Sequence, residues 1–347
     1  MGLRLRMSAV GLLGIALAIG LAGSASAGPT VVEHATGQSA DDIRDYWTPE
    51  RMRAAEPIEP PAAPEAATAS NRAPDLYAQA PDQEIDPALD VTFPYRIHGL
   101  LFITTSQGNG TCSATVVKSF TANLLLTAGH CVATPPLQWH TNLLFVPAYR
   151  NKVRPFGSYP ATKLGAPTLW LQEGDISFDL GTVNLAPGPA GEIQDVLGAR
   201  GVTFNRRPKK YNGNTFEIFG YPAKPDTFYD GERPILCISP FQGFEDFTGS
   251  PVAGPCHQQQ GSSGGGWVRN GLVSSVVSHG GCIIPSTACE ITSGTYFGDE
   301  AYKLWDKAAG SVPKGRRKRI KKCKAIDKNS KRLNCLNRAE TYQPVPR

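Results

Sequence analysis

Short runs of apolar and β-branched residues recur along the chain from Phe93 onward, and clusters of glycine, proline and asparagine separate them. Runs of about four to eight such residues are typical of β-strands, and the clusters are typical of the turns that join strands. The predicted strands lie at residues 100–104, 114–117, 124–127, 143–146, 178–183, 215–219 and 271–278.

Helical periodicity appears only late in this part of the chain, at residues 299–309. There Ala301, Leu304, Trp305 and Ala308 fall on one helix face. Many short strands followed by one terminal helix indicate an all-β barrel or sandwich domain. With 347 residues, 41% of them hydrophobic, the chain can build a sizeable buried core.

Residues 28–92 do not follow the strand pattern. They are rich in alanine, proline and acidic residues and have little apolar periodicity. Such a segment buries too little apolar surface to offset the entropy of ordering its backbone. We therefore predict a pro-segment or a disordered linker ahead of a domain at residues 93–309.

Residues 1–27 have the pattern of a secretory signal peptide. Arg4 and Arg6 precede an apolar run at 9–22, and residues 25–27 (Ala-Ser-Ala) form a small-residue cleavage site. An uncleaved membrane anchor is the alternative, which the clear cleavage pattern disfavours. No later apolar run is long enough to span a bilayer. The expected mature protein is secreted and extracellular, without membrane contact after signal cleavage.

Eight cysteines agree with an oxidising compartment. Pairing between sequence neighbours is the simplest of many connectivities. It would join Cys112 with Cys131, Cys237 with Cys256, Cys282 with Cys289, and Cys323 with Cys335. There is no Cys-x-x-Cys and no histidine pair with ligand spacing, so no metal site is expected.

The net charge of +5 is unevenly distributed, because residues 310–347 are strongly basic. A dense run of like charges is usually a solvated tail, here with a loop that Cys323 and Cys335 could close. Contact with a polyanion is the functional alternative for this tail.

Residues 261–265 (Gly-Ser-Ser-Gly-Gly) place glycines on both sides of a serine pair. Glycine allows a sharp turn that exposes one hydroxyl and gathers several backbone N–H groups in a small space. A nucleophilic serine beside an oxyanion hole requires such a turn. Alone, however, a glycine-serine segment is more often a flexible turn, so the interpretation depends on partners elsewhere.

A nucleophilic serine needs a base, and the base needs an orienting carboxylate. His130 ends the apolar run 124–130, and a strand there would hold its ring in a fixed place beside Cys131. The other histidines are His34 in the expected pro-segment, His98 before the first strand, His140 in a polar turn, and His257 and His279 near the serine in sequence.

Asp179 is the preferred carboxylate. It lies within an apolar run, where a charge is costly unless a partner compensates for it. Asp175, at the polar edge of the same run, is the second candidate.

Residues 127–131 (Thr-Ala-Gly-His-Cys), 179–181 (Asp-Leu-Gly) and 261–265 resemble the three signatures of trypsin-like serine peptidases, in the order His, Asp, Ser. An α/β-hydrolase has its partners after the serine, and here only His279 follows it. A narrower resemblance, to the secreted bacterial glutamyl-endopeptidase-like branch, is carried by residues 100–102, 112–114, 139–149 and 219–223 and by the cysteine shortly before the serine motif.

The resemblance implies an all-β, chymotrypsin-like double β-barrel with a C-terminal helix and a site between the barrels. It implies that Ser263 is the nucleophile, His130 the general base and Asp179 its orienting partner. The N–H groups of Gly261 and Ser263 would form the oxyanion hole. The remaining implied contacts are Ser278, which would support the aspartate and begin a substrate-pairing strand, and Gly280 on that strand.

Two features depart from the family pattern. Ser262 replaces the aspartate that binds the new amino terminus in digestive zymogens, so the activation step and the cleavage point stay open. His257 and His279 would lie at the base and rim of the primary pocket and could suit an acidic substrate side chain. Against this, Val277 stands where glutamate-specific members carry histidine.

The sequence thus predicts a secreted, monomeric serine endopeptidase, made as a zymogen, that acts on proteins or peptides without a cofactor. A neutral histidine base implies activity that rises through about pH 6–7.5. The alternatives are a catalytically silent binding module of the same fold, tethered to a polyanion by its basic tail, and an esterase or lipase, which the motif order disfavours.

Overall fold

The computed structural model describes Gly2 and residues 30–59, 82–206, 215–223, 228–258, 260–281 and 291–310. The expected signal peptide, the basic tail beyond Gly310 and four of the cysteines lie outside these residues; the cysteines are Cys282, Cys289, Cys323 and Cys335. The predictions made for them, polyanion contact included, therefore stay predictions. Within the described residues, no helix is long and apolar enough to cross a membrane.

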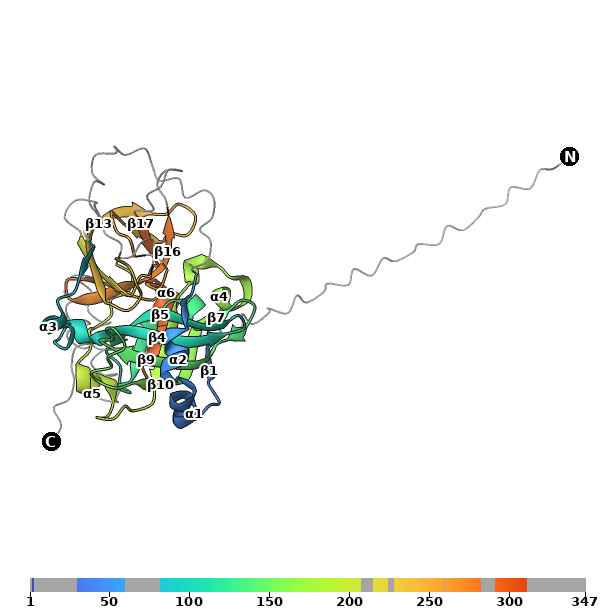
Figure 1. Ribbon diagram of the computed structural model, residues 1–347. Helices are drawn as coiled ribbons and strands as arrows, with labels where there is room; N and C mark the ends of the chain where they lie inside the picture. Colours follow the sequence, from blue (N-terminus) through green and yellow to red (C-terminus); the bar gives the residue numbers. More distant parts are fainter. Residues whose placement is uncertain are drawn as a thin grey trace, which may run out of the picture.

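Two closed antiparallel barrels form the molecule and lie one above the other in Figure 1. The first has the strand order β10-β11-β6-β5-β4-β9 and closes by pairing of β10 with β9. Its strands are β4 (His98–Thr105), β5 (Gly108–Val117), β6 (Leu124–Thr127), β9 (Thr141–Pro147), β10 (Tyr159–Pro167) and β11 (Gly181–Leu185). A short hairpin, β7 (Ala133–Thr134) and β8 (Gln138–Trp139), lies between β6 and β9 in the chain.

The second barrel has the order β12-β15-β16-β17-β14-β13 and closes by pairing of β12 with β13. Its strands are β12 (Thr215–Gly220), β13 (Ile235–Phe244), β14 (Pro251–Ala253), β15 (Gly266–Arg269), β16 (Leu272–Gly281) and β17 (Ile291–Gly294). The short helices of the domain are α4 (Thr168–Glu173), α5 (Ile193–Leu197), η2 (Tyr95–Ile97), η3 (Gly129–Cys131) and η4 (Ile176–Phe178). The chymotrypsin-like double barrel and its terminal helix, α6 (Asp299–Ala308), are confirmed.

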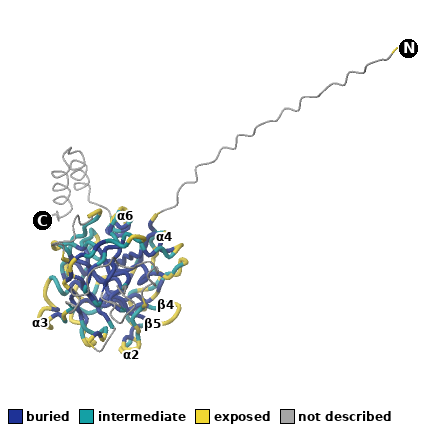
Figure 2. The backbone as a smooth tube through the Cα atoms, turned by 90° about the horizontal axis from the view of Figure 1, so that it is seen from above, coloured by how far each residue is buried: buried dark blue, intermediate teal, exposed yellow. Residues whose placement is uncertain are grey.

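The two barrels share a hydrophobic interface. Leu124 and Leu126 of β6 pack in the same cluster as Val268 and Val276 of the second barrel. Leu304 of α6 joins this cluster and is fully buried, so the helix covers the junction. In Figure 2 the buried residues fill the interior, and the exposed ones lie around the rim.

Residues 30–59 are ordered, so the expected disordered linker is wrong for this part. They form β1 (Val31–Ala35), α1 (Ala40–Tyr46), α2 (Pro49–Arg53) and β2 (Glu56–Pro57). β1 pairs with β10 and β2 with β5, which extends the first barrel's sheet. Trp47 is 2% exposed, packs on Phe102 at 5.3 Å between ring centroids, and donates to the carbonyl of Asn142.

Local signals explain this order. Ser39 forms a capping box with Asp42 at the start of α1, and Thr48 caps α2 before a proline at the first helical position. These caps and a few buried side chains such as Trp47 order the segment. It has no continuous apolar periodicity, and the lack of that pattern is what predicted disorder. The alternative interpretation, a pro-segment, is not tested by this order and stays a prediction.

Residues 82–92 are also ordered, as β3 (Asp82–Glu84) and α3 (Pro87–Asp90). β3 pairs with β13 of the second barrel. Arg150 binds both Glu84 and Asp90, and Arg233 binds Glu84 at 2.6 Å. Glu84 and Asp90, two of the acidic residues in the segment predicted to be a disordered linker, are therefore partners of arginines on the barrels.

Candidate active site

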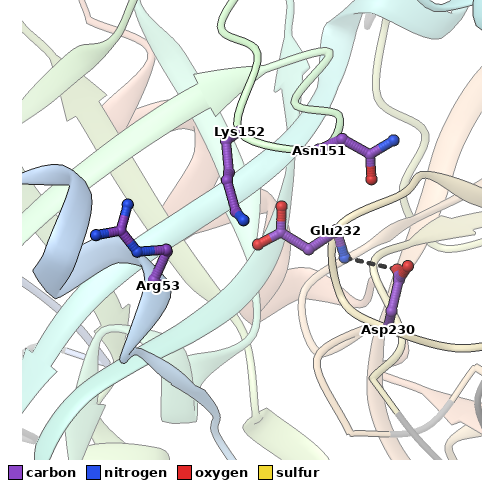
Figure 3. A pocket seen from close by; sticks show the side chains of 5 residues that line it. All are labelled: Arg53, Asn151, Lys152, Asp230 and Glu232. Atoms are coloured by element: carbon purple, nitrogen blue, oxygen red, sulfur yellow. Dashed lines mark hydrogen bonds between the residues drawn. The ribbon is translucent and has the colours of Figure 1, made fainter.

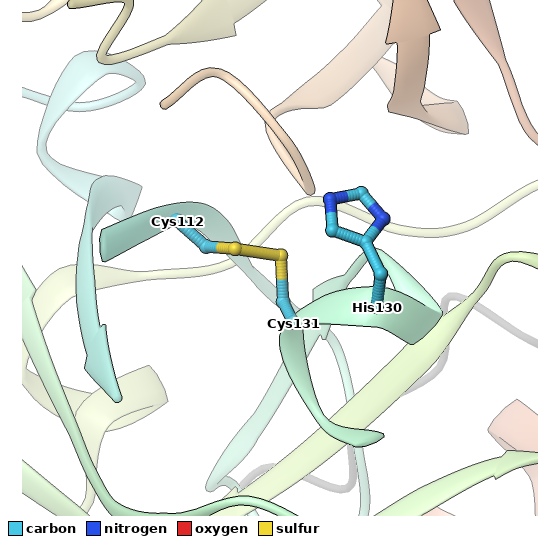
Figure 4. A group of neighbouring side chains, drawn as sticks. All are labelled: Cys112, His130 and Cys131. Atoms are coloured by element: carbon cyan, nitrogen blue, oxygen red, sulfur yellow. A yellow bond between two sulfur atoms is a disulfide. The ribbon is translucent and has the colours of Figure 1, made fainter. Parts of the chain in front are cut away.

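His130 lies where β6 ends and the short helix η3 begins. The disulfide between Cys112 and Cys131 ties η3 to β5, and the imidazole lies next to this disulfide in Figure 4. The preceding Gly129 has no room for a side chain, because a Cβ there would come within 2.9 Å of Asp179 Oδ1. This close approach brings the backbone of η3 onto the aspartate.

Asp179 is fully buried and binds His130 twice. Its Oδ1 accepts the backbone N–H of His130 at 2.8 Å, and its Oδ2 lies 2.9 Å from His130 Nδ1. This pairing directs Nε2, the other ring nitrogen, away from the carboxylate. Such an arrangement fixes the ring orientation and the tautomer that a general base needs.

Two hydroxyls hold Asp179 from its other sides. Ser278 Oγ donates to Oδ2 at 2.6 Å, and Thr295 Oγ1 donates to the backbone carbonyl. Burial alone would raise the pKa of Asp179, but the adjacent His130 and the hydrogen bonds from His130 and Ser278 outweigh it and hold the pKa below its usual value. The carboxylate is therefore ionised at neutral pH.

The loop of residues 261–265 makes the sharp turn that its glycines predict. Gly261 and Gly264 have φ of +91° and +84°, a region that favours glycine. The carbonyl of Ser263 accepts the N–H of Ser113 at 2.7 Å, and Gly264 donates to the carbonyl of Val277 at 2.7 Å. The loop is thus fixed between β5 of the first barrel and β16 of the second.

The N–H groups of Gly261 and Ser263 donate to no other residue within the described part of the chain. Ser263 Oγ and His130 Nε2 are both buried and have no hydrogen-bond partner there, so the structure does not join them directly. Buried polar atoms without partners are rare and often mark function. Catalytic hydrogen bonds are frequently long in the absence of substrate.

Packing of the serine loop on the histidine segment is nevertheless close. A Cβ at Gly264 would lie 2.0 Å from Thr127 Oγ1 and 2.8 Å from the backbone nitrogen of Ala128. Those two residues directly precede η3, which carries His130. The loop that bears Ser263 therefore packs against the segment that leads into η3.

His279 does not lie on an open pocket rim, which corrects that expectation. It is 1% exposed; its Nδ1 lies 3.1 Å from Ser278 Oγ, and its Nε2 lies 3.0 Å from Glu245 Oε1. Both ring nitrogens are therefore engaged within the protein and are unavailable to a substrate carboxylate. The adjacent Gly280 pairs with Thr292 of β17.

His257 is half-buried and lies in a second polar group. Its Nδ1 lies 3.1 Å from the hydroxyl of Tyr229, and its backbone N–H donates to Asp82 Oδ2 at 3.0 Å. Burial raises the pKa of Asp82, and the hydrogen bond from Tyr229 opposes this rise only in part. Asp82, from the segment ahead of the predicted domain, thus reaches the residue expected at the base of the primary pocket.

Sequence reasoning missed Asp82 and Glu245. Asp82 lies in the segment predicted to be disordered, and Glu245 follows β13 in a loop without apolar pattern. Each is brought to its histidine by pairing between strands far apart in the chain. No local signal marks either residue.

His98 and His140 also differ from expectation. His98, expected before the first strand, begins β4 and stacks on Phe219. His140, expected in a polar turn, is buried, and its Nε2 lies 3.0 Å from Thr134 Oγ1. Burial lowers the pKa of His140 to about 4, so it stays neutral near pH 7.

Two groups of neighbouring potential metal ligands occur among the described residues. Each contains two cysteines joined in a disulfide, Cys112 with Cys131 and Cys237 with Cys256. These two pairings follow the prediction. Disulfide sulfurs are not thiolates, so neither group offers the donors that a structural metal needs.

A cavity of about 290 Å³ opens where α2 faces the second barrel's 230–232 loop (Figure 3). Its lining consists of Arg53, Asn151, Lys152, Asp230 and Glu232. The charges of its two cationic and two anionic side chains cancel. None of the expected site residues lines it, so this cavity is separate from the candidate site.

The solved structures to which the chain is similar include serine proteases. The protease Anisep from Arthrobacter nicotinovorans is 29% identical with a TM-score of 0.58, and the match covers 66% of this chain and 100% of that one. The thermostable serine protease AL20 from an extremophilic microorganism is 28% identical with a TM-score of 0.55, over 62% of this chain and 98% of that one. A Glu endopeptidase shares the fold, at 17% identity and a TM-score of 0.52 over 68% of this chain and 99% of that one.

Among curated proteins, the Extracellular metalloprotease of Bacillus subtilis (strain 168) is 27% identical over 104 residues, 29% of this chain. The match spans about a third (32%) of the length of that relative. No protein-family profile matches the chain. The class that the fold and its neighbours define is that of trypsin-like serine proteases, and the expected resemblance is confirmed at this level.

Proposed function

We propose that the chain is a secreted serine endopeptidase that hydrolyses peptide bonds through His130, Asp179 and Ser263. One observation carries the proposal. His130 is held by a buried, ionised carboxylate with Nε2 left unpartnered, beside a fixed turn that bears an unpartnered serine hydroxyl and two unused N–H groups. The silent binding module gains no support, since all three side chains are present.

In the proposed reaction, Ser263 Oγ attacks the scissile carbonyl carbon while His130 Nε2 takes the hydroxyl proton. The carbonyl oxygen becomes an oxyanion, and the N–H groups of Gly261 and Ser263 stabilise it, an effect worth about 3 kcal/mol per donor in related chemistry. The C–N bond then breaks, and His130 gives its proton to the leaving amine. Asp179 stabilises the imidazolium throughout without taking the proton.

The acyl-enzyme that remains is an ester of Ser263. Water attacks this ester, His130 accepts a proton from the water and returns one to Ser263 Oγ, and the carboxylic acid product leaves. No cofactor is needed for either half of the reaction. For the preferred side chain, His257 is the remaining candidate, because both nitrogens of His279 are already engaged.

We also propose that the chain is made as a zymogen in which residues 56–59 obstruct the leaving-group side of the site. The serine loop separates β16, the expected substrate-pairing strand, from β5, so a leaving group departs on the β5 side. There Ile58 donates its N–H to the carbonyl of Thr111 at 3.0 Å, and Gln260 donates to Glu59 Oε1 at 2.8 Å. Gln260 directly precedes Gly261 of the proposed oxyanion hole.

This position gives a test of processing. Peptide substrates extended on the leaving-group side should be cleaved more slowly by the unprocessed chain than by the processed one. Small ester substrates, which have no residues there, should show little difference. Equal peptide-to-ester ratios before and after processing would contradict obstruction by residues 56–59.

The activity itself is tested by hydrolysis of a mixed fluorogenic peptide library by the processed wild type and by Ser263→Ala. Turnover by the wild type that is lost in the variant, with an unchanged melting temperature, is the expected result. Equal turnover by both proteins would contradict Ser263 as the nucleophile. The preferred sequence is read from the cleaved peptides, and secretion from the amino terminus of the protein in the culture medium.

A further inference from the structure

Hydrogen bonds continue past Asp179 on the side away from His130. Ser278 Oγ lies 2.6 Å from Asp179 Oδ2, His279 Nδ1 lies 3.1 Å from Ser278 Oγ, and His279 Nε2 lies 3.0 and 3.1 Å from the two carboxylate oxygens of Glu245. The proposed triad therefore ends in a second histidine–carboxylate pair. Nothing in the triad mechanism requires this pair.

The direction of each bond follows from counting protons. Asp179 is ionised and can only accept, so the single hydroxyl proton of Ser278 must go to it. Ser278 Oγ has no other proton, so it can only accept from His279 Nδ1. Glu245 also accepts, because its pKa lies below the usual value: burial would raise it, but hydrogen bonds from His279, Ser293 and Thr248 lower it more. Both ring nitrogens of His279 therefore donate.

The backbone explains how two successive side chains come into contact. In a regular strand, neighbouring side chains point to opposite faces. The register of β16 against β17 shifts between Val277 and His279, as at a β-bulge, which re-aims a side chain. The bulge thus turns His279 toward the oxygen of Ser278.

Glu245, at the far end of this series of hydrogen bonds, is buried and hydrogen-bonded as well. Ser293 donates to Glu245 Oε1, and Thr248 donates to Glu245 Oε2. The side chains of His279 and Glu245 are only 1% and 10% exposed. A buried carboxylate with three donors is well compensated and can hold a cationic imidazole in place. The charged groups that face His279 are Glu245 directly and Asp179, with His130 beyond it, through Ser278.

We propose that His279 and Glu245 are positioning residues that act on Asp179 through Ser278. Glu245 keeps His279 doubly protonated, and His279 Nδ1 then donates to Ser278 Oγ, so the serine proton is directed to Asp179 Oδ2. The carboxylate is thereby held in the orientation that fixes His130. This inference rests on the proposed function, since its effect is read on the reactivity of Ser263.

A matched pair of substitutions at one position tests it. In His279→Asn the amide nitrogen replaces Nδ1 and still donates to Ser278, whereas in His279→Gln it replaces Nε2 and reaches only Glu245. The rate constant for labelling of Ser263 by a fluorophosphonate should stay within about threefold of wild type in the Asn variant. It should fall about tenfold in the Gln variant, the effect of one lost charge-assisted hydrogen bond.

Equal labelling rates in the two variants, whether both slow or both at the wild-type level, would overturn the proposal. Melting temperatures of the two proteins separate this result from misfolding. If the Gln variant does not fold, His279→Asn combined with Glu245→Gln is measured instead. This double variant keeps the donor to Ser278, so it should also stay within about threefold of wild type.

A second readout does not depend on catalysis. Nitrogen NMR of histidine-labelled protein should find both ring nitrogens of His279 protonated at pH 7 in the wild type, and one of them deprotonated in Glu245→Gln. The exposed Glu217→Gln on β12 is the control and should leave the signal unchanged. A singly protonated His279 in the wild type would refute the inference even in an active enzyme. An inactive wild type with doubly protonated His279 would instead refute the proposed function.

Discussion

Replacement of Asp179 by asparagine removes the charge of the site while keeping its shape. In the wild type Oδ1 accepts the backbone N–H of His130, and Oδ2 accepts both Ser278 Oγ and His130 Nδ1. Asparagine offers one oxygen and one NH₂ group in their place. One of the two positions must therefore bring a donor toward a donor.

The two orientations of the asparagine amide differ in whether the neighbouring donors can adjust to an amide nitrogen. The backbone N–H of His130 cannot change, so an amide nitrogen at the Oδ1 position would face a fixed donor. At the Oδ2 position, the Ser278 hydroxyl can rotate, and the imidazole proton can move from Nδ1 to Nε2. The amide nitrogen therefore takes the Oδ2 position, and the ring becomes the tautomer with a protonated Nε2, which cannot accept the proton of Ser263.

We expect Asp179→Asn to lower kcat about 10⁴-fold, as for loss of the orienting carboxylate in such triads. This corresponds to about 5.5 kcal/mol of transition-state stabilisation. The assay is steady-state hydrolysis of a fluorogenic peptide, with the melting temperature as a check on folding. Asp175→Asn is the matched control, since among the described residues the Asp175 side chain only accepts the N–H of Ser177 as the cap of η4. A kcat for Asp179→Asn within tenfold of wild type, or an equal loss in Asp175→Asn, would refute the reasoning.

Three further predictions concern stability. Gly264→Ala forces an alanine to φ near +84° and should cost at least about 1–2 kcal/mol; a wild-type melting temperature would contradict it. Trp47→Ala should cost about 3–5 kcal/mol in urea unfolding of the chain that retains residues 30–59, and a loss under 1 kcal/mol would be inconsistent with the packing. His140 is neutral when folded and titrates near 6.5 when unfolded, so the unfolded state binds more protons as pH falls from about 6.5 to about 4, and about 3 kcal/mol is lost. His140→Gln should reduce that slope, and an unchanged slope would exclude the explanation.

Strands buried on both faces were the easiest elements to predict. The run at 124–127 matches β6 residue for residue, because all four of its side chains are buried and the apolar run ends where the barrel ends. α6 was found for a related reason, since its buried residues Ala301, Leu304 and Ala308 repeat at helical spacing.

Residues 178–183 show where prediction from apolar runs fails. They were predicted as one strand, but η4 ends at Phe178 and β11 begins only at Gly181. Asp175 caps the N–H of Ser177 and so favours a short helical turn ahead of Asp179. The apolar surroundings of Asp179 still predict a partner for its charge, whether or not the residue lies in a strand.

Long-range contacts account for what the sequence did not reveal. Glu245 meets His279 because β13 pairs with β14, β14 with β17, and β17 with β16. No local pattern encodes that sequence of pairings. The order of residues 30–59 was missed for the same reason, since Trp47 is stabilised by Phe102 and Asn142, residues far along the chain.

Covalent labelling tests the central claim most directly. The processed protein is treated with a fluorophosphonate and digested, and the modified residue is located by mass spectrometry. The account predicts a single adduct on Ser263, no adduct in Ser263→Ala, and normal labelling in Ser262→Ala. Absence of labelling in the wild type, or an adduct that persists in Ser263→Ala, would contradict it.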